Sequence, residues 1–178
     1  MMDKAESVFN AGAADYLESV LERLNSEYEE AAARCDSEIE KIMLAALMFM
    51  NSGWHDSAPT AVRVGRRGQG DQVVIYPQKE VGSYRVDFAV HAEFGDMLPT
   101  VKVAVECDGH EFHEKTKEQA ARDKARDRVL ATSGYTVLRF TGSEIYRDAP
   151  ACAEQVASVI FETISAAVEL HCRRGAQP

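Results

Sequence analysis

Two β-type segments with acidic residues at their ends constrain the fold of this chain more than any other feature. The first lies at residues 84–88 and the second at residues 101–107, where apolar and polar residues alternate. This alternation is typical of a half-buried strand, and it places Glu106 and Asp108 on one face. A carboxylate is costly to bury unless it is paired, hydrogen-bonded or bound to a cation. Acids such as Asp87 and Glu106 at neighbouring strand ends therefore indicate a metal ion or a proton-transfer reaction.

The elements around these strands predict an α/β fold. Residues 72–81 and 84–93 are β-rich and are separated by a Gly-Ser dipeptide, which is typical of a hairpin. Residues 114–132 contain neither proline nor glycine and are rich in helix-forming residues, and residues 135–140 have the pattern of another strand. A strand, a long helix and a second strand predict a right-handed crossover between parallel strands. We expect a small mixed sheet of about four strands flanked by helices.

Three further helices are expected. Residues 4–34 place apolar side chains at helical spacing, which predicts an amphipathic N-terminal extension. Ser37 is followed three residues later by Glu40, the capping-box pattern that begins a helix, and a last helix is expected to begin near residues 148–150. These elements divide the chain into a helical extension at residues 1–35, a main domain at residues 36–172 and a tail at residues 173–178.

Composition and charge narrow the class of protein. With 178 residues and 46% hydrophobic composition, the chain can bury the core of one domain. Its four cysteines form no CxxC pair, which argues against a zinc ribbon and against a disulfide framework. The net charge of -9 argues mildly against nucleic-acid binding, although basic residues gather at 63–67 and 115–128.

The sequence carries no pattern typical of secretion or membrane insertion. The N-terminus lacks a basic start followed by an apolar run. The longest apolar stretch, residues 42–50, is far too short to span a bilayer. We expect a cytoplasmic protein that does not enter a membrane.

Five motifs, in this order and spacing, resemble the very-short-patch-repair-like branch of the PD-(D/E)XK nuclease superfamily. They cover roughly residues 37–160. Each motif is weak alone, whereas five in the correct order are specific. The motifs are SxxE at Ser37 and Glu40, YRVDF at residues 84–88, ExDG at residues 106–109, the histidines His110 and His113, and DxxRDxxLxxxGYxVLRF at residues 123–140.

The resemblance implies a restriction-endonuclease-like core and a metal-dependent DNA endonuclease. In this family the metal is held where the acid-bearing strands end, so Asp87, Glu106 and the backbone carbonyl of Cys107 are the implied ligands of Mg²⁺ or Mn²⁺. The metal would polarise the scissile phosphate and lower the pKa of a bound water that attacks it. Glu40 is implied as a supporting catalytic residue that binds the metal directly or through water.

One position departs from the commonest pattern of the superfamily. Many members carry lysine two residues after the strand glutamate, where this chain has Asp108. In the very-short-patch-repair-like branch histidine takes that role, so His110 or His113 is implied to orient or deprotonate water, or to protonate the leaving oxygen. One of these histidines could instead cap the following helix, and the pattern slightly favours His113 for catalysis. Asp108 completes the implied catalytic set.

Four arginines are candidates for binding DNA phosphates. Arg126 lies on the crossover helix, and Arg139 is a charged residue within an apolar strand, so each could meet a phosphate or a carboxylate of the site. Arg66 and Arg67 lie in a glycine-rich loop that could close over a nucleic-acid backbone. Solvated or ion-paired surface positions are the alternative for all four.

Three other interpretations stay open. The chain could be a nuclease-fold module that binds nucleic acid without cutting it, which the missing lysine and the negative net charge favour. It could also be a protein-interaction domain that forms a homodimer through its N-terminal helix. A structural zinc site formed by the two histidines with Cys107 and Asp108 is disfavoured, because no second Cys/His pair stands at a suitable spacing.

Overall fold

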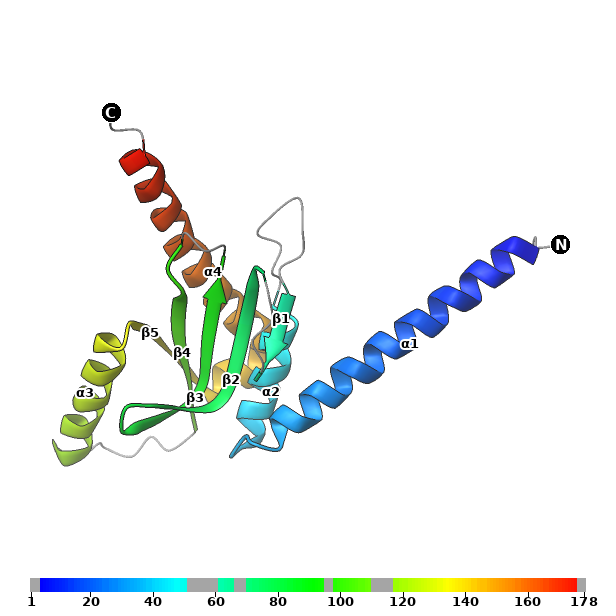
Figure 1. The fold of residues 1–178 in the computed structure, drawn as a ribbon. Coiled ribbons are helices and arrows are strands. Elements are labelled where there is room, and N and C mark those ends of the chain that lie inside the picture. Colours follow the sequence, from blue (N-terminus) through cyan, green and yellow to red (C-terminus); the bar gives the residue numbers. More distant parts are fainter. Residues whose placement is uncertain (1–3, 51–60, 66–69, 95–97, 110–116, 176–178) are drawn as a thin grey trace.

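The structure, a computed structural model, describes residues 4–50, 61–65, 70–94, 98–109 and 117–175. It has the α/β architecture expected from the sequence, a mixed sheet with helices on both faces, consistent with a restriction-endonuclease-like core (Figure 1). The elements in chain order are α1 (Lys4–Ala32), α2 (Glu38–Met48), β1 (Ala61–Val64), β2 (Gln72–Val81), β3 (Tyr84–Glu93), β4 (Val101–Asp108), α3 (Lys117–Thr132), β5 (Tyr135–Thr141) and α4 (Gly142–Gly175).

The sheet has the strand order β1-β2-β3-β4-β5. β2 and β3 form the expected antiparallel hairpin, β3 and β4 are antiparallel, and β4 and β5 are parallel, which confirms the crossover prediction. The expectation of about four strands missed β1, which pairs in parallel with β2. β1 has only four residues, too few to show an alternating pattern, so its place in the sheet emerges only from the folded chain.

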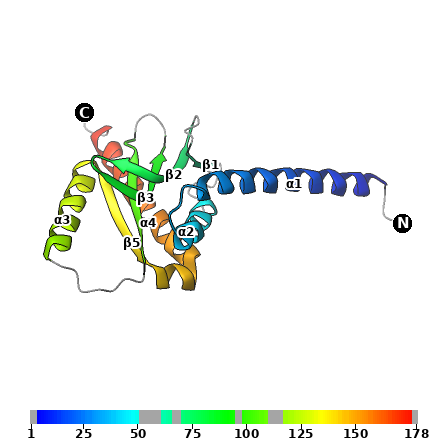
Figure 2. The ribbon, with the colours of Figure 1, turned by 90° about the horizontal axis from the view of Figure 1, so that it is seen from below.

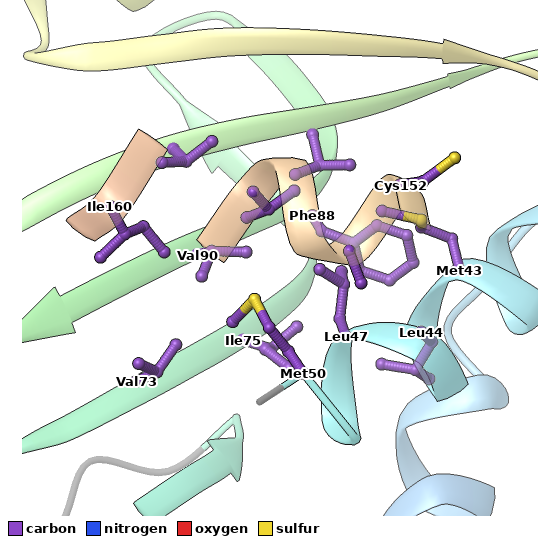
Figure 3. Packing of buried hydrophobic residues seen from close by; sticks show 14 of the residues in the cluster. Met43, Leu44, Leu47, Met50, Val73, Ile75, Phe88, Val90, Cys152 and Ile160 are labelled. Atoms are coloured by element: carbon purple, nitrogen blue, oxygen red, sulfur yellow. The ribbon is translucent and has the colours of Figure 1, made fainter. Parts of the chain in front are cut away.

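Different helices cover the two faces of the sheet. α2 and α4 lie against one face and α3 lies against the other (Figures 1 and 2). The first face holds the main core, in which residues of α2, α4 and the central strands pack around Phe88 (Figure 3). The second face buries a smaller apolar cluster around Leu130 of α3 and Ala104 of β4. Alternating side chains of the same strands supply both faces.

Capping boxes begin α2 and α4. Ser37 is the N-cap of α2, and its Oγ accepts the backbone N–H of Glu40 at 3.3 Å, which confirms the sequence prediction. At α4, Thr141 Oγ1 accepts the N–H of Glu144, whose Oε2 accepts the N–H of Thr141. The expected start near residues 148–150 was therefore too late. It corresponds to a kink at Asp148 inside α4.

Two long helices extend beyond the sheet. α1 projects from the body as an arm, and among its described side chains those of the last turns, including Ala31 and Ala32, contribute to the main core (Figures 1 and 2). The homodimer expected through this helix stays a prediction. By length and composition residues 142–173 could cross a membrane, but α4 buries Ile145 and Ile160 in the main core.

Candidate active site

The hairpin of β2 and β3 changes direction at Gln78 and Asp87. These residues face each other in register between two regular pairs, but they are not paired themselves. Gln78 has a positive φ of 51°, which turns the strand. On one side of this bend Phe88 lies in the main core, whereas on the other side Val86 packs in the cluster beneath α3. The tip of the hairpin therefore curls toward α3 (Figure 1).

A glycine lets the hairpin tip approach α3 closely. Gly82 has a φ of 62° at the first position of the two-residue turn, a region that glycine adopts without steric strain. A Cβ atom added there would lie 3.0 Å from Val129 Cγ1 of α3. The tip of the hairpin and α3 are thus in contact. At the bend β2 no longer pairs with β1, because that pairing covers only residues 72–75 of β2.

The bend brings Asp87 beside Glu106. β3 and β4 stay paired as far as Phe88 and Val105, and Asp87 and Glu106 are the next residues in register. Here the regular ladder ends, and Asp87 Oδ2 accepts the backbone N–H of Cys107 at 2.7 Å. A carboxylate that accepts the N–H next to Glu106 lies against the Glu106 backbone, so both acids occupy the same corner of the sheet.

Both carboxyl groups are harder to ionise than they would be in water. Burial raises the pKa of Asp87, the Cys107 N–H lowers it, and the charge of Glu40 raises it. Burial raises the pKa of Glu106 to about 7, with Arg126 opposing the rise and Asp87 adding to it. Glu106 is only 4% exposed. A bound cation or proton would relieve the repulsion between the buried Glu106 and the partly buried Asp87.

Arg126 of α3 is the cationic partner of Glu106. Its Nη2 forms an ion pair with Glu106 Oε1 and donates a 3.0 Å hydrogen bond to the backbone carbonyl of Arg85. The contact between the two side chains lacks hydrogen-bond geometry, so Glu106 Oε1 and Arg126 Nε are buried without a hydrogen-bond partner among the described residues. Of the two partners expected for Arg126, the structure shows the carboxylate.

Glu40 of α2 approaches the same corner from the opposite face of the sheet. It is buried, and its carboxylate accepts hydrogen bonds from Ser37 Oγ at 2.8 Å, the Asp36 N–H at 2.9 Å and Gln78 Nε2 at 2.6 Å. All three donors belong to neutral groups. Because its charge raises the pKa of Asp87, the two carboxylates are electrostatically coupled. We call the set Glu40, Asp87, Glu106 and Asp108 the acidic corner.

Three further expected residues are Asp108, which belongs to the acidic corner, and its neighbours Cys107 and Arg139. Asp108 ends β4 and is exposed. Cys107 packs its side chain against the main core, and burial raises the pKa of its thiol far above the usual range, so the thiol stays protonated. Arg139 of β5 forms an ion pair with Asp127 of α3. The structure therefore shows Arg139 bound to a carboxylate on the helix rather than to one of the acidic corner.

Four expected residues, His110, His113, Arg66 and Arg67, lie outside the described residues. Within the described ranges, no group of three or more His, Cys, Asp or Glu side chains is arranged to hold a metal ion. Asp87 and Glu106 are thus a pair of acids, with Glu40 as a neighbour rather than a preformed third ligand.

Sequence reasoning missed Gln78. It links Glu40 to the bend opposite Asp87, and its Oε1 is buried without a hydrogen-bond partner in the described part of the chain. A single glutamine after a proline forms no recognisable motif. Only the register of the folded sheet places it beside the acids, so the sequence carried no signal that could have identified it.

A cleft of about 480 Å³ opens beside the acidic corner, between α1 and the strands β1 and β2. Arg23 and Arg34 of α1 line it, together with Arg63 of β1 and Pro77 of β2. Two glutamates of α1 also line the cleft, and one of them forms an ion pair with Arg34. Pro77 directly precedes Gln78, so one wall of the cleft is next to the bend, whereas none of the four residues of the acidic corner lines the cleft.

Proteins similar to this chain indicate one class of domain. The model of the REase_MTES_1575 family, a restriction-endonuclease-like family, matches residues 63–160, more than half of the chain. The matched segment includes Asp87 and Glu106 but not Glu40. The chain is also 29% identical to an uncharacterized protein of Haemophilus influenzae over 104 residues, 57% of this chain and 78% of that protein. No solved structure gives a significant match.

Proposed function

The chain belongs to the REase_MTES_1575 family of restriction-endonuclease-like domains, and from this membership and its acidic corner we propose that it is a metal-dependent endonuclease that hydrolyses phosphodiester bonds in DNA. The family match supports a nuclease-type domain of the PD-(D/E)XK kind. The metal, the DNA substrate and the very-short-patch-repair-like subtype are parts of the proposal.

The observation that supports this proposal most is the proximity of Asp87 to Glu106. Both are largely removed from water, and each has a raised pKa. Acids with a purely structural role are usually solvated or matched by cations. Among the described residues, Arg126 contacts Glu106 and no cation contacts Asp87. When both acids are ionised, one arginine faces two carboxylates, and this imbalance supports a site that receives a further cation.

The donor set fits a small divalent cation. Mg²⁺ prefers oxygen ligands and is often bound through one or two carboxylates, with water completing its shell. Asp87 and Glu106 offer carboxylate oxygens, and the backbone of Cys107 offers a carbonyl oxygen. Glu40 would support the cation through water. We therefore propose Mg²⁺, with Mn²⁺ as a substitute.

The residues of the corner have distinct proposed roles in hydrolysis. When bound, the metal supplies positive charge that polarises the phosphate and lowers the pKa of a water molecule. Arg126 keeps Glu106 in place and reduces the repulsion that an incoming phosphate would meet. We propose that Asp108, His110 and His113 orient the attacking water or carry its proton.

The cleft beside the acidic corner is the proposed path of the DNA backbone. Arginine side chains match phosphate oxygens in charge and geometry. Arg34 and Arg63 line the cleft, and Arg66 and Arg67 follow in the sequence. Arg126 is paired with Glu106, and Arg139 is paired with Asp127. These pairs support structural roles for the two arginines rather than direct binding of the substrate.

Plasmid cleavage tests the proposal. We expect Asp87→Asn and Glu106→Gln to reduce nicking of supercoiled DNA in Mg²⁺ by at least about a thousandfold, because each change removes a proposed ligand. Glu80→Gln, which alters an exposed acid of β2, is the matched control and should cut like the parent. Circular dichroism checks that the variants fold. Parent-like cutting by both site variants would reject the assignment.

A second candidate is a nuclease-fold module that binds nucleic acid without cutting it. Two observations favour it: Asp108 occupies the common lysine position, and Arg126 already neutralises Glu106. Such a module would bind DNA equally well with Mg²⁺ or with EDTA and would leave supercoiled, linear, mismatched and branched DNA intact. If the parent protein cleaves DNA in Mg²⁺ and this cleavage stops in EDTA, the chain is a nuclease and the binding-module alternative is rejected.

A further inference from the structure

Gln78 combines an unfavourable backbone conformation with a position beside the acidic corner. Among the non-glycine residues that the structure describes, Gln78 is the one with a positive φ, which is 51°. For a residue with a side chain this conformation costs about 1–2 kcal/mol relative to the right-handed region. A glycine would produce the same bend without that strain. The side chain of Gln78 is therefore expected to have a role in addition to turning the strand.

The hydrogen bond of Gln78 fixes the direction of both ends of its amide. Nε2 donates to Glu40 Oε2 at 2.6 Å, so the NH₂ end of the amide faces Glu40. The carbonyl Oε1 then points away from Glu40. It is buried and lacks a hydrogen-bond partner among the described residues.

The position of Gln78 relates this amide to the pair of acids. Gln78 faces Asp87 across the bend of the hairpin, and it joins β2 to α2 through Glu40. Gln78 therefore connects Glu40 to the point of the hairpin at which Asp87 lies. An amide that connects these groups can set where the third carboxylate stands.

We propose that Gln78 is a positioning residue of the nuclease site: its Nε2 holds Glu40 toward Asp87, and its Oε1 accepts a hydrogen bond from a water molecule that hydrates the bound cation. This role rests on the proposed function. It explains why a strained backbone and a buried unpartnered oxygen occur at one residue. Groups that orient metal ligands typically change metal affinity or activity about 10–100-fold when removed.

The substitution Gln78→Gly separates the side chain from the bend. Glycine relieves the positive φ, so the variant should fold, and its melting temperature should fall modestly because the hydrogen bond to Glu40 is lost. Its affinity for Mn²⁺, measured by isothermal titration calorimetry, should fall about tenfold, and plasmid nicking should fall with it. If the variant binds Mn²⁺ and nicks plasmid like the parent, Gln78 only shapes the strand, and the proposal is overturned.

A double-mutant cycle with Glu40→Gln tests whether Gln78 acts through Glu40. In the Glu40→Gln background, Gln78→Gly should lower Mn²⁺ affinity clearly less than it does in the parent, because the role through Glu40 is lost and only the role of Oε1 toward water is left. Equal effects of Gln78→Gly in both backgrounds would overturn the link. Glu80→Gln serves as the charge-matched control on the same strand.

A measurement without metal separates this inference from the proposed function. Urea denaturation of the same four chains in EDTA should show non-additive shifts of the midpoint, because Gln78 and Glu40 share a hydrogen bond. Additive shifts would overturn the link between the two residues. A parent protein that neither binds Mn²⁺ nor cuts DNA would instead overturn the proposed function and the hydration role of Oε1, whatever the urea data show.

Discussion

The two faces of the sheet differ in how they are covered and in what they carry. The face beneath α2 and α4 buries a large apolar core around Phe88, whereas the face beneath α3 buries a small cluster and holds the ion pair of Glu106 with Arg126 (Figures 1 and 3). A large apolar interface stabilises the fold, and a thinner one leaves room for charged groups. The chain thus places most of its apolar packing on one face and the buried ion pair of Glu106 on the other.

Hydrogen bonding shows the same contrast. The buried side-chain atoms without a hydrogen-bond partner, within the described ranges, are Gln78 Oε1, Glu106 Oε1 and Arg126 Nε. All three lie at the bend or beneath α3, and none lies in the main core. Glu106 Oε1 and Arg126 Nε belong to one ion pair, whereas Gln78 Oε1 is a buried acceptor without a partner among the described residues, which is rare in native proteins.

The largest expected effect compares one substitution on the two faces. Leu47→Ala in the main core should lower the free energy of unfolding by about 4 kcal/mol, and Leu130→Ala beneath α3 by about 2–3 kcal/mol. Both leucines are fully buried, but α3 has fewer packed neighbours and can relax into the cavity. Urea denaturation in EDTA measures both values. A larger loss for Leu130→Ala would contradict the contrast between the faces.

The next effect concerns pH and the buried charge beneath α3. The folded pKa of Glu106, about 7, lies above its ordinary value of 4.5, so the folded state keeps a proton that the unfolded chain has lost. The free energy of unfolding should therefore fall as pH rises from about 4.5 to about 7, by up to about 3 kcal/mol, and then level off.

Glu106→Gln isolates this contribution, because glutamine does not ionise. Urea denaturation in EDTA at about pH 5 and about pH 8 should show that the parent loses more stability than the variant across this interval. Equal losses in the two chains would mean that Glu106 ionises normally. Added Mg²⁺ should restore part of the parent's stability at the higher pH, since a ligand that binds only the folded state stabilises it.

The smallest expected effect is the difference in stability between the two ion pairs that connect α3 to the sheet. Arg126→Ala leaves the buried Glu106 without its cation and should destabilise the protein by about 2 kcal/mol, whereas Arg139→Ala breaks a half-exposed pair with Asp127 and should cost about 0.5 kcal/mol. Thermal melting of both variants at neutral pH tests this order. Similar melting temperatures would show that burial does not distinguish the pairs.

Much of the fold could be predicted because its signals are local. The alternation in β4, the Gly-Ser turn of the hairpin and the capping box at Ser37 each depend on a few consecutive residues, and each element appears where the sequence indicated. The strand β1 and the early start of α4 were missed. β1 is too short to show a period, and the capping box at Thr141 directly follows a strand.

The site was predictable in its acids but not in their partners. Asp87 and Glu106 stood out as acids within apolar strand patterns, although Asp87 lies near the start of β3 rather than at the strand end that the sequence suggested. Arg126 was recognised as a candidate, yet the choice between phosphate and carboxylate depended on how α3 lies over β4. The contact between Glu40 and Gln78 joins residues 38 positions apart, so no local pattern contained it.

The sequence by itself determined which segments become strands and helices and which of them end in acids, because backbone geometry and the alternation of side chains act over a few residues. Only the tertiary structure decided the bend at Gln78, the approach of Glu40 to Asp87 and the pairing of Glu106 with Arg126. These contacts depend on strand register and helix placement, which are fixed by packing across the whole core rather than by neighbouring residues.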